Sequence, residues 1–210
     1  MTEMNAYTWV KICGITSVED ARAAASAGAD AVGLVFAGTK RRLSPRDAGT
    51  IVRMLPARIQ TVGVFMDEDP ETLRRLAREL GLDFVQLHGS ESPETCDGLP
   101  VKTIKRFPVG PADSRETVEQ RMNRYRVFAS LLDPGAGDGV PFDWTVAQGL
   151  SGRLIVAGGL TPDNVGSAVR TLNPFGVDVS SGVESGPGKK DPAKMRRFIE
   201  EVRCASVAAP

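Results

Sequence analysis

The stretch from Trp9 to Thr16, Trp-Val-Lys-Ile-Cys-Gly-Ile-Thr, decides how the rest of the chain is interpreted. An apolar run with β-branched residues ends at Cys13, and an amphipathic pattern begins near Val18, which predicts a strand, a tight turn and a helix. Cys13 therefore stands at the end of a strand. Side chains meet ligands at such positions in parallel α/β proteins, so the thiol is a candidate for chemistry.

Length and composition favour one globular domain that binds a small molecule. The chain has 210 residues, of which 41% are hydrophobic and 25% are charged, values that suit a single domain with a sizeable core. Its 26 basic and 26 acidic residues give a formal net charge of zero. Neither nucleic acid nor an anionic membrane is therefore expected as the main partner.

The cysteines and the N-terminal segment indicate in which cellular compartment the protein is expected. Cys13, Cys96 and Cys204 are an odd, dispersed set without metal-type spacing, which favours a reducing compartment and no disulfide framework. Cys96 and Cys204 fall in helical patterns and are interpreted as packing residues. Residues 1–8 carry no targeting pattern, and no apolar run approaches about 18 residues, so we expect a cytoplasmic protein.

Strand and helix patterns alternate along the whole chain. Strands are predicted near residues 9–13, 31–36, 61–65, 84–87, 101–104, 127–132, 154–157 and 176–179. Helices are predicted near residues 18–27, 45–55, 70–80, 93–97, 114–124, 144–150, 162–172 and 192–204. Gly28 and Gly81 are expected to end two of these helices, and Thr161 to cap another.

Eight strand–helix units are the number that closes a parallel barrel. The predicted fold is an α/β (β/α)8 TIM barrel, with residues 1–210 as one catalytic domain. The alternative is an open doubly wound sheet, but the turn Cys13-Gly14-Ile15-Thr16 lacks the glycine-rich dinucleotide fingerprint.

In a closed barrel the loops that follow the strands converge on one face. Cys13 and Asp133, which end the first and sixth predicted strands, can then face each other across the mouth. A thiol and a carboxyl so placed suit a general base and a general acid. An inert buried cysteine is the commoner fate of a free thiol, and it stays open as an alternative.

The last two loops favour a phosphate site. Gly158-Gly159-Leu160-Thr161 precedes a helix, and Ser180-Ser181-Gly182 follows the final strand, so both loops can offer backbone N–H groups and hydroxyls. Barrels often bind a phosphate at this place. The simpler alternative is that the paired glycines only turn the chain.

Three further polar residues follow other predicted strands. Arg41 could pair with a ligand carboxylate, although a run such as Lys40-Arg41-Arg42 is more often a solvated surface. His88 is the only histidine in the chain and lacks the companions that a metal site needs. We interpret it as a positioning group near the ligand, beside Gln86.

Five motifs in a fixed order add a resemblance to this picture. They are Lys11–Thr16, Val85–Gly89, Leu131–Asp133, Gly158–Leu160 and Val177–Glu184, with Phe142–Trp144 and Pro187–Asp191 as further matches. Together they resemble the phosphoribosylanthranilate isomerase family of tryptophan biosynthesis. The resemblance implies an Amadori rearrangement of N-(5-phosphoribosyl)anthranilate to 1-(2-carboxyphenylamino)-1-deoxyribulose 5-phosphate, without a cofactor or metal.

The resemblance also implies roles for particular residues. Cys13 falls on the general base of the family and Asp133 on its general acid. The candidate substrate-binding residues are Lys11, Arg41, Gln86, His88 and Asp178, and the candidate phosphate-binding residues are Gly158, Gly159, Ser180, Ser181 and Gly182. Lys11 lies on the same face of its strand as Cys13, so it is the cation expected to favour the thiolate.

One departure concerns the loop after Asp133. Where the family usually has Gly-Gly-Thr-Gly or Gly-Gly-Ser-Gly, this chain has Gly135-Ala136-Gly137-Asp138-Gly139. Asp138 brings a second carboxylate close to Asp133, and like charges raise one another's pKa. Which carboxylate serves as the acid therefore stays open.

Two alternative functions remain. One is a barrel that also isomerises the related aminoaldose of histidine biosynthesis, but such barrels tend to use two aspartates rather than a thiol. The other is a non-catalytic sugar-phosphate sensor, which could lose the acid and base that this chain retains. A monomer is expected because monomers are common in the family that the chain resembles.

Overall fold

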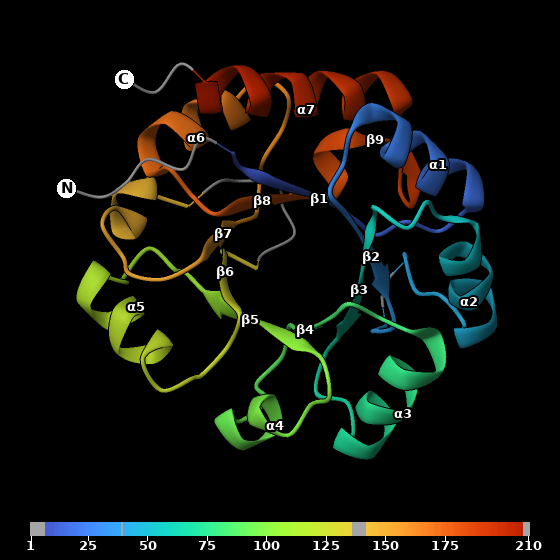
Figure 1. Ribbon diagram of the computed structural model, residues 1–210. Coiled ribbons are helices and arrows are strands. Elements are labelled where there is room, and N and C mark those ends of the chain that lie inside the picture. The colour runs from blue at the N-terminus through green and yellow to red at the C-terminus, as the bar shows by residue number, and fades with distance from the viewer. Residues whose placement is uncertain (1–6, 39, 136–141, 208–210) are drawn as a thin grey trace.

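The computed structural model describes residues 7–38, 40–135 and 142–207, and its main strands form a closed parallel barrel (Figure 1). Strands β1 to β8 are hydrogen-bonded in chain order, and β8 pairs with β1 to close the ring. The predicted TIM barrel is confirmed. The open doubly wound sheet is excluded because a sheet of that kind has two free edges.

The strands alternate with helices that surround the barrel in Figure 1. The barrel strands are β1 Trp9–Cys13, β2 Ala31–Val35, β3 Gln60–Phe65, β4 Phe84–Leu87, β5 Lys102–Pro108, β6 Ala129–Asp133, β7 Leu154–Val156 and β8 Gly176–Val179. The helices are α1 Val18–Ala27, α2 Pro45–Met54, α3 Pro70–Leu80, α4 Pro93–Asp97, α5 Arg115–Met122, α6 Val165–Leu172 and α7 Pro192–Val207. Two short 3-10 helices, η1 Trp144–Ala147 and η2 Ser181–Val183, and a hairpin of β9 Glu184–Gly186 and β10 Lys189–Lys190 complete the described elements.

Capping side chains fix several helix ends where the sequence predicts them. Ser17 accepts a hydrogen bond from the Asp20 N–H at the start of α1, and Gly28 ends this helix with φ 96°. Asp69 caps α3, and Gly81 ends it in the left-handed conformation. The predicted bounds of α1, α3, β4, α4 and β8 are confirmed.

Other boundaries differ because of contacts between distant segments. Strand β5 continues to Pro108, past the predicted end at residue 104, because its pairing with β6 extends to Asp133. Helix α6 begins at Val165 with Asn164 at its N-cap position, later than the predicted start at residue 162. Thr161 instead caps the turn before this helix: its hydroxyl oxygen accepts a hydrogen bond from the Asp163 N–H at 3.2 Å, and the Asn164 side chain accepts one from the Thr161 N–H at 2.8 Å. The sequence analysis did not predict the β9–β10 hairpin. Cys96 is buried as expected, whereas Cys204 is exposed and is not a packing residue.

Aromatic side chains fill the end of the barrel at which the strands begin. Trp9 lies 6.1 Å from both Phe84 and Phe175, measured between ring centroids, and Phe128 lies 5.1 Å from Phe84. We call these four residues the aromatic floor. Because it fills this end, a ligand has to enter from the opposite end, where the strands finish.

The C-terminal helix closes the ring against the first strand. Helix α7 packs on α1 and α6 (Figure 1). The Arg203 guanidinium donates hydrogen bonds to the Thr8 carbonyl and, at 2.9 Å, to Asp30. The Ser206 hydroxyl donates to Thr8 Oγ1 at 2.9 Å. Within the described ranges, none of the helices is both long enough and apolar enough to cross a membrane.

Candidate active site

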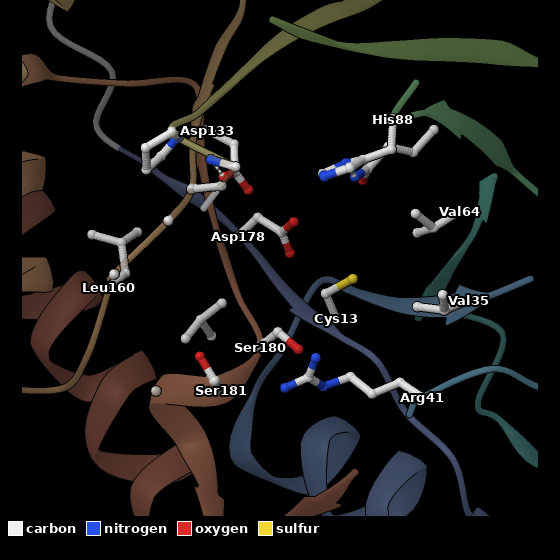
Figure 2. Close-up of a pocket in the computed structure, with 18 of the residues that line it drawn as sticks. Cys13, Val35, Arg41, Val64, His88, Asp133, Leu160, Asp178, Ser180 and Ser181 are labelled. Atoms are coloured by element: carbon white, nitrogen blue, oxygen red, sulfur yellow. Dashed lines mark hydrogen bonds between the residues drawn. The ribbon is translucent and has the colours of Figure 1, made fainter. Parts of the chain in front are cut away.

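A cavity of about 320 Å³ lies at the end of the barrel opposite the aromatic floor (Figure 2). Its volume is in the range of sites for small molecules. All the predicted site residues line it except Lys11. The polar lining residues are Cys13, Arg41, Gln86, His88, Asp133, Asp178, Ser180 and Ser181, and apolar ones include Val35, Val64, Met66 and Leu160.

Cys13 and Asp133 both line this cavity, and they come from two strands that are not neighbours in the barrel. Each is the last residue of its strand, Cys13 of β1 and Asp133 of β6. Figure 2 shows both side chains directed towards the cavity, with the carboxylate of Asp178 between them in this view. One carboxylate oxygen of Asp133 accepts a hydrogen bond from the Gly135 N–H at 2.6 Å. The arrangement allows an acid and a base to act on different atoms of one small ligand.

Lys11 lies beneath the cavity rather than in its wall. The β1–β8 pairing places it opposite Asp178, and its Nζ lies 3.0 and 2.9 Å from the two carboxylate oxygens. Burial alone would lower the pKa of Lys11, but the Asp178 carboxylate and the Cys13 sulfur together outweigh it, and the net shift is upward. Lys11 therefore remains charged, and direct contact between Lys11 and a substrate stays a prediction.

The ionisation of Cys13 depends on its buried surroundings. Burial raises the pKa of the thiol, the Lys11 ammonium lowers it, and the Asp178 carboxylate raises it again, with a net upward shift. Lys11 is thus the strongest influence that favours the thiolate.

Replacing Lys11 by methionine is expected to raise the pKa of Cys13 further, because it removes the charge that most favours the thiolate. The measurement is the pH dependence of the alkylation rate, in a Cys204→Ser background so that the exposed thiol does not react. The profile should move to higher pH. Arg75→Met, in an exposed ion pair with Glu79, is the matched control. An unchanged profile for Lys11→Met would contradict the assigned role of Lys11.

His88 and Gln86 form a pair at the end of β4. Gln86 Nε2 lies 3.1 Å from His88 Nδ1, and because an amide nitrogen only donates, the Nδ1 atom accepts and the imidazole proton sits on Nε2. Burial lowers the pKa of His88 to about 4, although the Asp133 carboxylate opposes this shift. His88 is therefore a neutral hydrogen-bond donor on the cavity wall at neutral pH.

The single imidazole signal in an NMR pH titration should accordingly stay unshifted from pH 8 to about pH 5.5. In the unfolded chain His88 has the ordinary histidine pKa of about 6.5. In the folded protein its pKa is about 4, so it binds a proton only at lower pH. The free energy of unfolding should therefore fall as the pH drops through this window, by about 3 kcal/mol in total. His88→Asn should remove this contribution. A titration midpoint near pH 6.5 would show that the imidazole is not desolvated.

Arg41 forms part of the cavity wall instead of a solvated charged face. Its side chain crosses Gly14, where a Cβ atom would lie 2.4 Å from Arg41 Cδ, so only glycine fits, and its φ of +74° also favours glycine. The Nε and Nη2 atoms of Arg41 donate to the two carboxylate oxygens of Glu184 at 2.7 and 2.8 Å. The plane of the guanidinium is thereby fixed.

The two glycine-containing loops lie against each other at the cavity. Gly158 and Gly159 have φ values of +81° and +65°, and a Cβ atom on Gly182 would lie 1.9 Å from the Leu160 carbonyl oxygen. The Asn164 side chain donates to the Gly159 carbonyl at 2.9 Å and holds the first loop. The predicted phosphate-binding residues are therefore brought together at the cavity.

Sequence reasoning missed several charged residues around the site. Glu184 and Lys190 form a buried ion pair of 2.8 Å, and Arg106 donates to the Asp133 carbonyl at 3.4 Å. Glu184 stands in a motif already noted, but its contact with Arg41 spans 143 residues and has no local signal. Asp138 lies outside the described residues. In the part of the chain that the structure describes, no three His, Cys, Asp or Glu side chains gather as a metal site would require.

A closed (β/α)8 barrel with a thiol, a carboxyl and two glycine-containing loops at one end defines a barrel enzyme for a small anionic substrate. A family model described as N-(5'phosphoribosyl)anthranilate (PRA) isomerase matches residues 10–201. The chain belongs to this family.

Individual relatives agree with this assignment. An N-(5'-phosphoribosyl)anthranilate isomerase of Desulforudis audaxviator is 51% identical, over 93% of this chain and 98% of the relative. The structure of phosphoribosyl anthranilate isomerase from Thermotoga maritima is 41% identical with a TM-score of 0.86, covering 94% of this chain and 100% of that one. Another, in complex with reduced 1-(o-carboxyphenylamino)-1-deoxyribulose 5-phosphate, is 41% identical with a TM-score of 0.85 and the same coverage.

Proposed function

We propose that this chain converts N-(5-phosphoribosyl)anthranilate to 1-(2-carboxyphenylamino)-1-deoxyribulose 5-phosphate by general acid and base catalysis. One observation carries the assignment of roles: Cys13 and Asp133, from β1 and β6, line the same cavity as Arg41 and the two glycine-containing loops. A substrate with a phosphate at one end and a carboxylate at the other matches this distribution of groups.

Each part of the substrate has a suitable neighbour. The phosphate fits the loops at Gly158–Gly159 and Ser180–Gly182, and the carboxylate of the anthranilate fits Arg41. The aromatic ring fits the apolar wall formed by Val35 and Val64. The ribose then lies between the thiol and the carboxyl.

Polar groups of β4 suit the hydroxyls of the ribose. Gln86 Oε1 is buried and has no hydrogen-bond partner among the described residues, so it can accept a hydrogen bond from a substrate hydroxyl. The Nε2–H of His88 can donate to a substrate oxygen. These two residues orient the sugar without taking part in proton transfer.

The reaction proceeds in two proton-transfer steps. Asp133 protonates the furanose ring oxygen, and the C1–O bond breaks to give an iminium ion on the substrate nitrogen. Cys13 then removes the proton at C2, in the thiolate form that burial disfavours and the Lys11 ammonium favours, and the electrons of the C–H bond move to form the enolamine. Tautomerisation gives the aminoketose. The substrate nitrogen serves as the electron sink, so these steps require no cofactor.

Turnover of freshly prepared substrate tests the proposal. The purified protein should abolish the anthranilate-type fluorescence when the next enzyme of the pathway removes the product. Binding without turnover would instead support the sugar-phosphate sensor. Turnover of the histidine-pathway aminoaldose as well would support the dual-substrate alternative, which the names of the relatives described above do not favour.

Two properties of the protein in solution complete the proposal. We propose that the enzyme is cytoplasmic and monomeric. One related structure, from Thermotoga maritima, is described as monomers generated from a dimeric phosphoribosylanthranilate isomerase. Light scattering at micromolar concentration separates the two states of this chain, and a mass of twice 22.4 kDa would contradict the monomer.

A further inference from the structure

We propose that Glu184 is a positioning residue that holds both ends of the substrate site, through Arg41 on one side and through Lys190 and Ser180 on the other. The inference rests on the proposed function, because it assigns the two ends to the substrate carboxylate and phosphate. Glu184 does not line the cavity. It acts through the residues that it orients.

The Glu184 carboxylate bridges two cations from separate segments. Its Oε1 lies 2.7 Å from Arg41 Nε and 2.8 Å from Lys190 Nζ, and its Oε2 lies 2.8 Å from Arg41 Nη2. Glu184 is 8% exposed and Lys190 is 1% exposed, so neither charge is well solvated. The two basic groups lower the pKa of Glu184 to about 2 even though its burial opposes this shift, and the carboxylate stays ionised.

Lys190, held by Glu184, in turn contacts Ser180 in the loop after β8. Its Nζ donates to the Ser180 carbonyl at 3.1 Å and lies 3.4 Å from Ser180 Oγ. An ammonium group only donates, so Oγ accepts, and the hydroxyl proton of Ser180 points away from Lys190. Ser180 lines the cavity. Its hydroxyl is therefore oriented to donate to an anion there.

The hairpin that carries Glu184 and Lys190 is itself held in place. The Lys190 N–H donates to Asp20 of α1 at 3.1 Å, and Lys194 Nζ donates to the Glu184 carbonyl at 2.9 Å. The Asp191 N–H donates to the Val183 carbonyl at 2.9 Å. A carboxylate on a fixed backbone can in turn fix the side chains that it pairs with.

Charge explains why this position requires a carboxylate. Arg41 and Lys190 carry two positive charges, and both pair with the single carboxylate of Glu184. A glutamine has a single oxygen acceptor and no charge, so it cannot satisfy both guanidinium N–H groups and the ammonium group. Arg41 then loses its fixed plane, and Lys190 becomes an uncompensated buried cation.

The test compares Glu184→Gln with the wild-type protein and with Glu79→Gln, the same substitution in an exposed ion pair. Calorimetric titration with anthranilate probes the carboxylate end, and titration with inorganic phosphate probes the other end. Neither measurement depends on turnover. In addition, kcat and KM are measured with the full substrate, and circular dichroism checks the fold.

We expect Glu184→Gln to weaken the binding of anthranilate and of phosphate by about tenfold each, to raise KM by about 10- to 100-fold and to change kcat by less than about threefold. Glu79→Gln should match the wild type. If Glu184→Gln does not fold, the pair Glu184→Gln with Lys190→Met removes the buried cation as well, and the same loss of anthranilate binding is expected.

The inference is overturned if the folded variant binds both anions as tightly as the wild type, if the wild type binds neither, or if Glu79→Gln shows the same losses. A fall in kcat alone also overturns it, because Glu184 would then affect the chemical step rather than binding. Failure of the proposed function leads to a different result: no turnover by the wild type, with anion binding that still depends on Glu184.

Discussion

Replacement of Cys13 by alanine is expected to lower kcat by about 10²- to 10⁴-fold, the usual contribution of a general base. The thiol is the group assigned to remove the C2 proton, and alanine offers no base at that place. Binding should persist because Arg41 and the two glycine-containing loops are unchanged, so KM should move little. Steady-state kinetics with fresh substrate, coupled to removal of the product, gives both constants.

The control for this variant is Cys204→Ala, the same substitution at the exposed thiol of α7, which should retain wild-type turnover. Cys13 is half-buried, so its truncation should leave thermal unfolding nearly unchanged, in contrast to a truncation in the core. Near-normal turnover by Cys13→Ala would remove the assigned role and favour the inert cysteine.

Replacement of Asp133 by asparagine is expected to lower kcat by a similar factor of about 10² to 10⁴. Asparagine has nearly the same shape, and its carbonyl oxygen can still accept the hydrogen bond from the Gly135 N–H. It has no acidic proton for the furanose ring oxygen, so ring opening should become the slow step. The measurement is again kcat with fresh substrate, together with its pH dependence.

Asp138→Asn is the matched variant for this prediction because it tests the second carboxylate of the same loop. If Asp133 is the acid, Asp138→Asn should turn over at a rate close to that of the wild type. A large loss in Asp138→Asn together with normal turnover in Asp133→Asn would move the acid role to Asp138.

The sequence predicts the fold well where the signal is local. Helix α3 is an example, since Pro70 at its first position and Gly81 directly after its last position mark its ends. The signal fails where distant partners decide the structure. Strand β5 extends to Pro108 only because β6 lies beside it.

The residues of the site also divide into those with a local sequence signal and those whose positions depend on distant partners. A parallel barrel brings the ends of its strands together, so Cys13, Asp133 and His88 could be placed at one cavity from their positions in the sequence. The buried position of Lys11 depends on the pairing of β1 with β8. The contact of Arg41 with Glu184 depends on the hairpin after β8, which is too short to give a clear pattern.

The closure of β1 against β8 has a consequence for synthesis of the chain. Strand β1 is made first, yet one of its two neighbours, β8, appears only at residues 176–179. A ribosome that adds roughly 5–20 residues per second needs about ten seconds or more to reach β8. Until then the nascent chain exposes an unpaired strand edge, which is a template for association with other chains. Helix α7, which contacts Thr8 through Arg203 and Ser206, follows β8 in the chain and is made later still. The barrel therefore cannot close before β8 has been made, and the nascent chain keeps this edge open to association until then.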